Sequence, residues 1–319
     1  MHDFAIFGGV LRTSFNFPEL VPAIGGTQPT WIFEVGTVPP TLNDATALGV
    51  DSVYANYKVR AFKRQAGGYS LVFDDTGRFD ISSDGTRVTW YDGSERMLDA
   101  ARADIVGRVL PLALHGSGIL SLHASAVAVG NEGIAFMAPK FHGKSTLATA
   151  LVEEGARLIT DDVLAVLISE PPICLPGVPR LRLWRDSVQA TFGSATAETV
   201  PDERKHLVGD LHDEQIQSLP IRFATAYILT PVNELPEGRA VMRESIDSIG
   251  ATLSLVQHAK LAPLLAGGEA GALFSQTASV AGSIRVFDLY IARDLSRLGE
   301  AAQAITRWHL RPEYASHLT

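Results

Sequence analysis

The sequence is poor in the features that mark several classes of protein. It contains one cysteine, Cys174, so no disulfide can form within the chain and a cysteine-based metal cluster is excluded. No uninterrupted apolar run approaches the ~18 residues of a membrane-spanning helix. The first residues lack the basic stretch of a signal peptide. We therefore expect a cytoplasmic protein with no membrane partner.

Positive charge is scarce as well. Lys and Arg number 27 against 35 Asp and Glu, which gives a net charge of -8 at pH 7. Because an acidic surface repels phosphate backbones, we expect no nucleic-acid partner. No internal repeat or heptad run is present, which excludes a solenoid or a coiled coil. A chain of 319 residues that is 46% hydrophobic has room for a large core in one or two domains.

The first third of the chain has the pattern of a β-rich domain. Apolar and polar residues alternate within residues 57–91, and turn signals stand at Gly67-Gly68 and Asp84-Gly85. This pattern predicts an antiparallel meander, with residues 18–50 mostly loop around one strand at 31–35. The expected strands of the meander cover residues 57–62, 69–73, 78–81 and 87–91.

A helical pattern follows the meander. It begins at Ser94, and apolar residues then recur at every third or fourth position. Pro111 should loosen the last turn, and Gly116-Ser117-Gly118 should end the helix. We place a domain boundary here, between a β-rich domain (1–115) and a second domain (116–319).

Strands and helices alternate after residue 119, which predicts an α/β core. The expected strands cover residues 120–129, 134–137, 157–160, 163–168, 223–229 and 284–291. The expected helices cover residues 145–154, 185–190, 245–265 and 295–308.

The most informative segment runs from Ala138 to Thr146, between an expected strand and an expected helix. It fits the phosphate-binding pattern G-x-x-x-x-G-K-[ST] at every position except the first, where Ala138 replaces glycine. Backbone N–H groups of such a loop, together with the start of the following helix, form a cradle for anions. The segment therefore predicts a site for the phosphates of ATP.

The residue types in this loop suit the binding of phosphate and Mg²⁺. Gly143 allows the backbone to approach phosphate oxygens, Lys144 brings positive charge to the β- and γ-phosphates, and Ser145 offers a hydroxyl ligand for Mg²⁺. Lys140 and His142 could add positive charge over the phosphates, although each could equally be a solvated loop residue. The predicted nucleotide-binding residues are Ala138, Lys140, His142, Gly143, Lys144, Ser145 and Thr146.

An acidic pair, Asp161-Asp162, follows the strand expected at residues 157–160. Ligands of open α/β sheets bind where the strands end. One carboxylate could hold Mg²⁺ while the other accepts the proton of an attacking hydroxyl, and the sequence does not say which does which. The alternative interpretation is a solvated turn without a chemical role.

Three segments together resemble a known family. Residues 122–127, 143–147 and 155–162 are similar to the C-terminal domain of HPr serine kinase/phosphorylase. The similarity is greater to stand-alone HPr-kinase-like proteins, some of which accompany peptide-modification systems such as lasso-peptide biosynthesis. The resemblance implies a P-loop kinase fold related to phosphoenolpyruvate carboxykinase, and kinases of this kind assemble into homo-oligomers.

The resemblance also implies roles for particular residues. Lys144 matches the family's phosphate-binding lysine and Ser145 its Mg²⁺-binding hydroxyl. Asp161 and Asp162 match its acidic pair, and His123 matches a histidine beside the active site. Without the family, His123 would be read as a structural residue of its strand.

The chain departs from the family pattern after the acidic pair. Bifunctional members carry a Glu-Ile-Arg-Gly-type signature there, whereas residues 175–184 contain no glutamate. The resemblance therefore does not extend to phosphorylase activity or to HPr as a substrate. Basic residues downstream could neutralise a transferred phosphate or could simply be solvated; they are Arg180, Arg182, Arg185, Lys205 and His206.

The sequence thus predicts an α/β, P-loop kinase-like domain preceded by a β-rich domain. The expected reaction is Mg²⁺-dependent transfer of the ATP γ-phosphate to a serine-type hydroxyl of a peptide or protein. Two alternatives stay open. The chain could bind ATP without catalysis, or it could phosphorylate a small hydroxylated metabolite.

Overall fold

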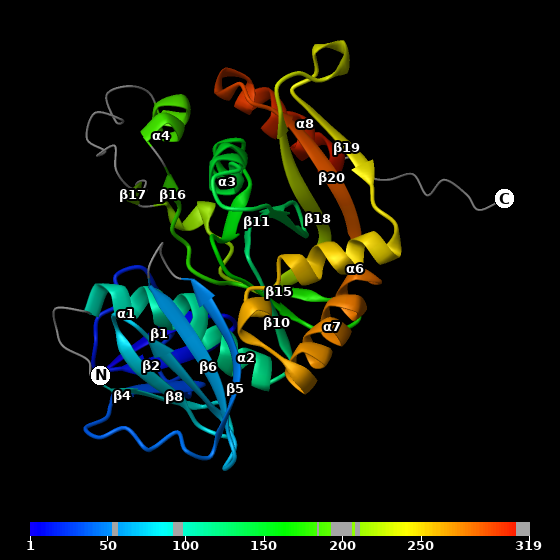
Figure 1. The fold of residues 1–319 in the computed structure, drawn as a ribbon. Coiled ribbons are helices and arrows are strands. Elements are labelled where there is room, and N and C mark those ends of the chain that lie inside the picture. The colour runs from blue at the N-terminus through cyan, green and yellow to red at the C-terminus, as the bar shows by residue number, and fades with distance from the viewer. Residues whose placement is uncertain (53–56, 92–97, 184, 193–205, 208–210, 311–319) are drawn as a thin grey trace.

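The computed structural model describes the chain apart from residues 53–56, 92–97, 184, 193–205, 208–210 and 311–319 (Figure 1). The described residues form a mixed α/β structure with two large sheets. The first sheet contains β1 (His2–Ile6), β2 (Gly9–Thr13), β3 (Val21–Pro22), β4 (Trp31–Val35), β5 (Ala45–Ser52), β6 (Lys58–Arg64), β7 (Tyr69–Phe73), β8 (Gly77–Ile81) and β9 (Arg87–Tyr91). Their order is β3-β1-β2-β4-β9-β8-β7-β6-β5.

The antiparallel meander expected over residues 57–91 is confirmed, because β6 to β9 pair antiparallel in sequence order. The expectation of one strand in residues 18–50 is wrong, since β3 and the start of β5 also lie there. Strand β5 lies at the sheet edge and buries no side chain fully. It therefore lacks the apolar alternation that marks a half-buried strand. The sequence analysis also missed the β1–β2 hairpin, whose turn residues Phe7 and Gly8 both have positive φ.

The helical segment after the meander is interrupted rather than uniform. It consists of α1 (Leu98–Asp104), a π-helical turn η2 (Ile105–Val109) and α2 (Leu110–Gly116). Pro111 was expected to loosen the last turn, but α2 continues to Gly116 and the irregularity precedes the proline. Pro111 has no N–H to donate to the carbonyl of Gly107, and the wider turn accommodates this loss. The expected cap, Ser94, lies outside the described residues.

The second sheet contains β10 (Ile119–Leu122), β11 (Ala124–Val129), β12 (Glu132–Met137), β13 (Arg157–Thr160), β14 (Leu164–Leu167), β15 (Ile173–Leu175), β18 (Ile221–Val232), β19 (Val241–Ser245) and β20 (Arg285–Ala292). Its order is β10-β14-β15-β18-β12-β11-β13, and β20 pairs with β18 and β19. β12, β18 and β20 run parallel to one another. Their carboxyl ends therefore meet at one edge of the sheet. A separate two-stranded pair joins β16 (Arg182–Leu183) to β17 (His206–Leu207).

The single strand expected over residues 120–129 is wrong, because the strand is interrupted at His123. β10 before the break pairs with β14, whereas β11 after it pairs with β12 and β13. The backbone N–H of His123 donates instead to the carbonyl of His258 (2.7 Å). The break thus places His123 between the two parts of the sheet.

Helices cover both faces of the second sheet (Figure 1). α3 (Lys144–Glu153) and α8 (Leu298–Leu310) pack on one face, and α6 (Ser248–Gln257) and α7 (Gly267–Ala281) pack on the other. The remaining helical segments are α4 (Arg185–Phe192), η3 (Asp213–Gln215), η4 (Pro236–Gly238), η5 (Ala262–Leu264) and η6 (Leu295–Arg297).

The single helix expected over residues 245–265 is wrong. α6 ends at Gln257 because the chain then pairs with the end of β10, where the N–H of Lys260 donates to the carbonyl of Ser121 (2.8 Å). The sequence analysis also missed α7. Its first turns are rich in glycine, which weakens a helical signal.

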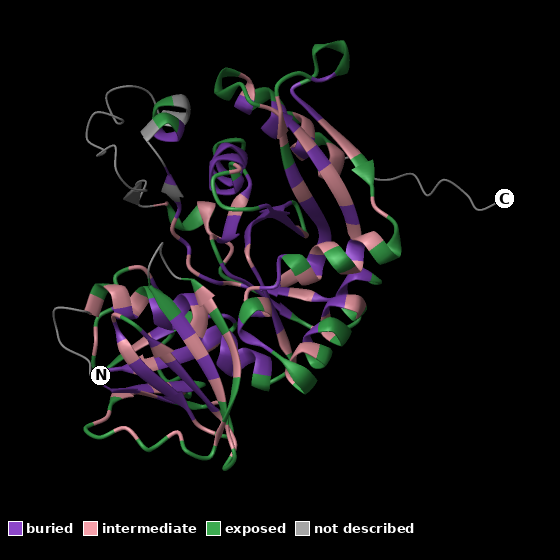
Figure 2. Ribbon diagram, viewed as in Figure 1, coloured by how far each residue is buried: buried purple, intermediate pink, exposed green. Residues whose placement is uncertain are grey.

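One cluster of buried apolar side chains continues from the first sheet across α1 and α2 into the second sheet. Figure 2 shows these buried residues running through both sheets. The boundary expected between residues 115 and 116 stays a prediction. None of the described helices is both long and apolar enough to span a membrane.

Candidate active site

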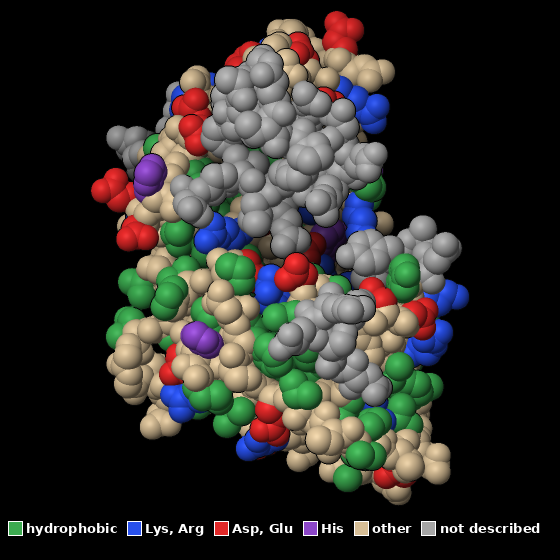
Figure 3. All heavy atoms as spheres, turned by 90° about the vertical axis from the view of Figure 1, so that its left-hand side faces the viewer, with side chains coloured by type: hydrophobic (Ala, Val, Ile, Leu, Met, Phe, Trp, Pro, Cys, Tyr) green, Lys and Arg blue, Asp and Glu red, His purple; other side chains and the backbone are tan. Residues whose placement is uncertain are grey.

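A cleft of about 830 Å³ lies at the sheet edge where β12, β18 and β20 end. Its walls come from the loop after β12, from the ends of β18 and β20, from the acidic pair after β13, and from α1 and η2. Figure 3 shows basic, acidic and histidine side chains together in the hollow between the upper and lower parts of the molecule. The cleft therefore occupies the edge at which α/β sheets bind ligands.

The loop between β12 and α3 turns sharply at two residues. Gly143, at the N-cap of α3, has φ 86°, and Phe141 has φ 70° with its side chain exposed. Ala138 is not among the residues with positive φ, so the alanine at the first motif position causes no backbone strain. The substitution that weakened the sequence match is thus conformationally neutral.

Lys144 begins α3, and its side chain folds back over the loop. Its Nζ donates hydrogen bonds to the carbonyl oxygens of Ala138 (2.8 Å) and Pro139 (3.3 Å), and to Nε2 of His123 (3.2 Å). The residue is only 8% exposed. A buried ammonium at the start of a helix, beside loop amides, is a favourable place for phosphate oxygens.

Asp161 is held by two hydroxyl groups from different elements. Ser145 of α3 donates to Oδ1 of Asp161 at 2.9 Å, and Ser125 of β11 donates to the same oxygen at 2.5 Å. Mg²⁺ at phosphate sites is typically bound by one or two carboxylates together with substrate phosphates. Asp161 and Ser145 supply oxygen donors of that kind, so they fit a magnesium ion.

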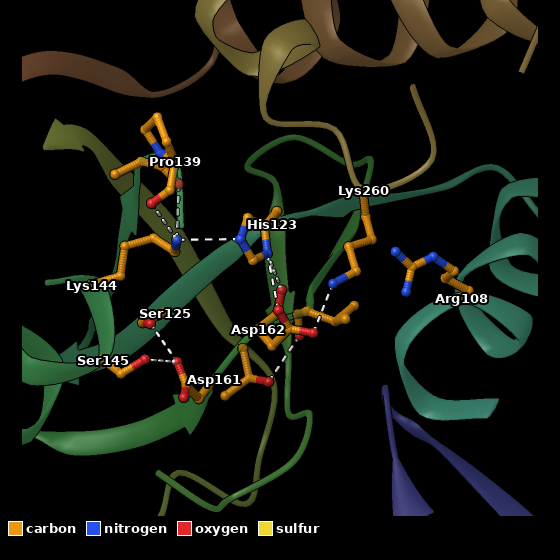
Figure 4. A network of polar contacts seen from close by, with 12 residues as sticks. Arg108, His123, Ser125, Pro139, Lys144, Ser145, Asp161, Asp162 and Lys260 are labelled. Atoms are coloured by element: carbon orange, nitrogen blue, oxygen red, sulfur yellow. Dashed lines mark hydrogen bonds and ion pairs between the residues drawn. The ribbon is translucent and has the colours of Figure 1, made fainter. Parts of the chain in front are cut away.

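Asp162 has different partners. Its Oδ2 accepts from Nζ of Lys260 (2.7 Å), and its Oδ1 lies 3.0 Å from Nδ1 of His123. Figure 4 shows His123 between Lys144 and Asp162, while the hydroxyls of Ser125 and Ser145 point to Asp161. The two neighbouring carboxylates therefore have separate environments, as different chemical roles require.

The hydrogen-bond pattern fixes the proton on His123. The Lys144 ammonium can only donate, so Nε2 of His123 accepts and Nδ1 carries the proton that is donated to Asp162. We assign this neutral tautomer from the geometry. His123 thereby links the lysine of the loop to the second carboxylate of the acidic pair.

Electrostatics keep Asp162 ionised. Desolvation by the cleft walls would raise its pKa, but the Lys260 ammonium and the hydrogen bond from His123 together hold the pKa well below its usual range. Its side chain is still 55% exposed, so the carboxylate remains accessible from the cleft. Burial lowers the pKa of His258 to about 4, and the positive charge of Lys144 acts in the same direction.

Three further predicted residues of the loop and helix start line the cleft, whereas Ala138 is fully buried and does not. Lys140 and His142 line it, and Nδ1 of His142 donates to the carbonyl of Lys140 (2.9 Å). Thr146 forms a hydroxyl–hydroxyl hydrogen bond with Ser187 of α4 (2.9 Å). All the predicted nucleotide-binding residues thus belong to one continuous loop and helix start.

Of the basic residues downstream, Arg180 lines the cleft and donates to the carbonyl of Pro18 (3.1 Å). The side chains of Arg182, Arg185, Lys205 and His206 lie outside the part of the structure that is described.

Sequence reasoning assigned no role to Ser125 or Lys260. Ser125 falls within one of the family-like segments, so its position two residues after His123 could have drawn attention. The residues next to Lys260 in the sequence form no motif that would mark it as a site residue. It reaches Asp162 only because residues 258–260 pair with the end of β10.

Comparisons with known proteins give little beyond this. No protein-family model and no curated protein matches the chain. Among solved structures, it is similar to the Hpr(Ser) kinase/phosphatase from Coxiella burnetii, with 15% sequence identity and a TM-score of 0.31. The alignment covers 60% of this chain and 92% of that one. A similarity of this size assigns neither an activity nor site residues to this chain.

Proposed function

We propose that the chain is a kinase that transfers the γ-phosphate of ATP to a serine-type hydroxyl. The observation that carries this proposal is the chain of contacts from Lys144 through His123 to Asp162. These contacts join the Lys144 ammonium, which would bind phosphate, to the ionised Asp162 carboxylate, which would receive the acceptor hydroxyl. Phosphoryl transfer needs such positioning and charge neutralisation more than it needs covalent chemistry by the enzyme.

The loop and α3 would hold the triphosphate. Backbone N–H groups around Gly143 cradle the phosphates, and Lys144 exchanges its bonds to loop carbonyls for bonds to phosphate oxygens. At one end of the cleft, Leu229, Pro231 and Ile291 provide an apolar surface for the nucleoside.

Ser145 and Asp161 would hold Mg²⁺. When bound, the ion neutralises charge on the phosphates and orients them. Ser125 donates to the same Asp161 oxygen as Ser145 and so fixes the carboxylate, which orients the oxygen ligands before the nucleotide enters.

Asp162 would receive the acceptor. The hydroxyl proton passes to the Asp162 carboxylate while the acceptor oxygen forms a bond to the γ-phosphorus. The bond between that phosphorus and its bridging oxygen breaks, and ADP leaves with the electron pair. Lys260 and His123 keep the carboxylate ionised and oriented until it accepts the proton.

The acceptor is proposed to be a serine of a peptide or protein. Residues 175–184 carry no glutamate signature, and nothing in the proposed step requires the reverse, phosphorylase reaction. A kinase for a small metabolite would use the same loop and the same acidic pair.

The test compares turnover of Mg·ATP in the wild type, Asp162→Asn and Asp161→Asn, with nucleotide affinity measured by calorimetry. Asp162→Asn is expected to bind ATP and to lower turnover by roughly 100-fold or more, the usual contribution of a general base. Asp161→Asn should weaken Mg·ATP more than ATP alone. Wild-type turnover in Asp162→Asn would contradict the assignment. Binding without turnover by the wild type would support the non-catalytic alternative.

A further inference from the structure

The cleft has two chemically different ends. One end carries a group of apolar residues from β18, β20, α8 and the loop before β19, namely Leu229, Pro231, Ala240, Ile291 and Leu298; Arg293, Asp294 and Arg297 line the cleft beside them. The other end is formed by α1 and η2, through Arg102, Ala103, Val106 and Gly107, with Glu19 beside them. The phosphate-binding loop lies among these residues, so a nucleotide whose base takes the apolar end leaves the α1–η2 end unfilled.

Of the acidic pair, Asp162 lies on the side of the α1–η2 end, whereas Asp161 is directed to Ser125 and Ser145 (Figure 4). Figure 4 shows Arg108 of η2 extending toward Lys260, whose ammonium holds Asp162. Arg108 is itself held by Asp51 of β5, 2.7 Å from one of its guanidinium nitrogens. The carboxylate proposed to accept the hydroxyl proton is thus next to the wall that the N-terminal part of the chain provides.

No described neighbouring side chain requires a glycine at position 107. It lies inside the π-helical turn, is buried, and a Cβ built on it meets no described atom within 4 Å. A glycine in a helix interior costs about 0.5–1 kcal/mol relative to alanine. The chain therefore carries a destabilising residue where the space beside it opens into the cleft.

The wall combines small side chains with one charged side chain. Ala103, Val106 and Gly107 have small side chains, which allow another backbone to come close. Arg102 forms ion pairs with Glu19, 3.4 Å from its Nε, and with Asp99, 2.8 Å from one of its terminal nitrogens. Its guanidinium is thereby held in position at this end of the cleft.

We propose that the α1–η2 wall is the acceptor subsite, that it binds a peptide segment, and that Gly107 sets how closely that segment approaches Asp162. This inference rests on the proposed kinase function. At about 830 Å³ the cleft is near the upper end of the ~300–1,000 Å³ of small-molecule sites. A nucleotide and the acceptor residue of a peptide therefore fit together.

The test uses a degenerate mixture of serine-centred peptides and ATP labelled at the γ-phosphate. Glycerol and free serine serve as small hydroxyl acceptors. The variants are Gly107→Leu, which fills the subsite, and Gly107→Ala, which adds one methyl group and favours the helix. The matched control is Gly271→Leu in α7, where a Cβ also meets no described atom and which does not line the cleft. Binding of a fluorescent ATP analogue is measured for every protein.

The wild type and Gly271→Leu are expected to label the peptides. Gly107→Leu should lower labelling on the order of 100-fold, because displacement of a reactant by about 1 Å can cost that much. Gly107→Ala should lower labelling by a smaller factor while raising the melting temperature. This second variant keeps the test decisive if Gly107→Leu does not fold.

The outcomes separate the two proposals. Absence of nucleotide binding by the wild type would overturn the kinase function itself. A wild type that binds and hydrolyses ATP but labels only glycerol or serine would overturn the peptide subsite alone. A wild type that labels no acceptor would overturn both proposals. Undiminished peptide labelling by both Gly107 variants would also overturn the peptide subsite.

Discussion

Asp104, at the end of α1, gives a prediction whose magnitude follows from its surroundings. The residue is 5% exposed, and its Oδ2 accepts from the Thr76 hydroxyl at 2.6 Å. Burial raises the pKa of Asp104 from 3.8 to about 6. The Thr76 hydrogen bond and the positive charge of Arg108 lower it, and the neighbouring Asp75 raises it.

The direction of the pH dependence follows from this shift. The folded chain binds the Asp104 proton more tightly than the unfolded chain, so stability falls as the pH rises from about 4 to about 6. A difference of about two pKa units (6 against 3.8), at ~1.36 kcal/mol per unit, costs about 3 kcal/mol at pH 7. Asp104→Asn has no proton to lose, and its amide oxygen can still accept from Thr76. The variant should therefore be up to about 3 kcal/mol more stable at neutral pH and little changed near pH 4.

Urea denaturation of the wild type and Asp104→Asn across this pH range measures the difference directly. Asp99→Asn is the matched control, because Asp99 lies in the same helix with its side chain 91% exposed. The control should not gain stability at neutral pH, because it relieves no buried charge. A stability difference for Asp104→Asn that is the same at every pH would refute the reasoning.

Three further predictions concern the site and the core. Lys260→Met removes the ammonium that holds the second carboxylate of the acidic pair. It should lower the rate of phosphate transfer, measured by single turnover, by a larger factor than it weakens ATP binding, measured by calorimetry. Gly177→Ala would place its Cβ 2.2 Å from a threonine hydroxyl, so it should lower the free energy of unfolding, measured by urea denaturation, by about 1–3 kcal/mol. Gly299→Ala, whose Cβ meets no described atom within 4 Å, should not lower it. Cys174 is buried and its pKa is raised, so a thiol reagent should react with it only after unfolding, and rapid labelling of the native chain would contradict its burial.

The sequence predicted the parts of the structure that depend on local signals. The meander followed from alternation and glycine turns. The segment from Ala138 to Thr146 does form a loop and helix start beside the acidic pair, because residue types at fixed spacing determine such a loop. Strand β13 and helix α3 also lie where they were expected, to within one residue.

The parts that were missed depend on tertiary contacts. Lys260 reaches the site through pairing with a strand more than 130 residues earlier in the chain, as the bond from its N–H to Ser121 shows. The break at His123 has the same origin, since its N–H pairs with the carbonyl of His258. The α1–η2 wall follows from packing of the helix against both sheets, which no periodicity in residues 98–116 reveals.

The dissociation constant of Mg·ATP for the wild type and Lys144→Ala tests the central claim most directly. Lys140→Ala is the matched control, because Lys140 also lines the cleft but belongs to the exposed part of the loop. Loss of a charged hydrogen bond of ~1.5–3 kcal/mol predicts that Lys144→Ala binds roughly 10- to 100-fold more weakly. Lys140→Ala should lose much less. A wild type that does not bind Mg·ATP, or a Lys144→Ala variant that binds it equally well, would contradict the account.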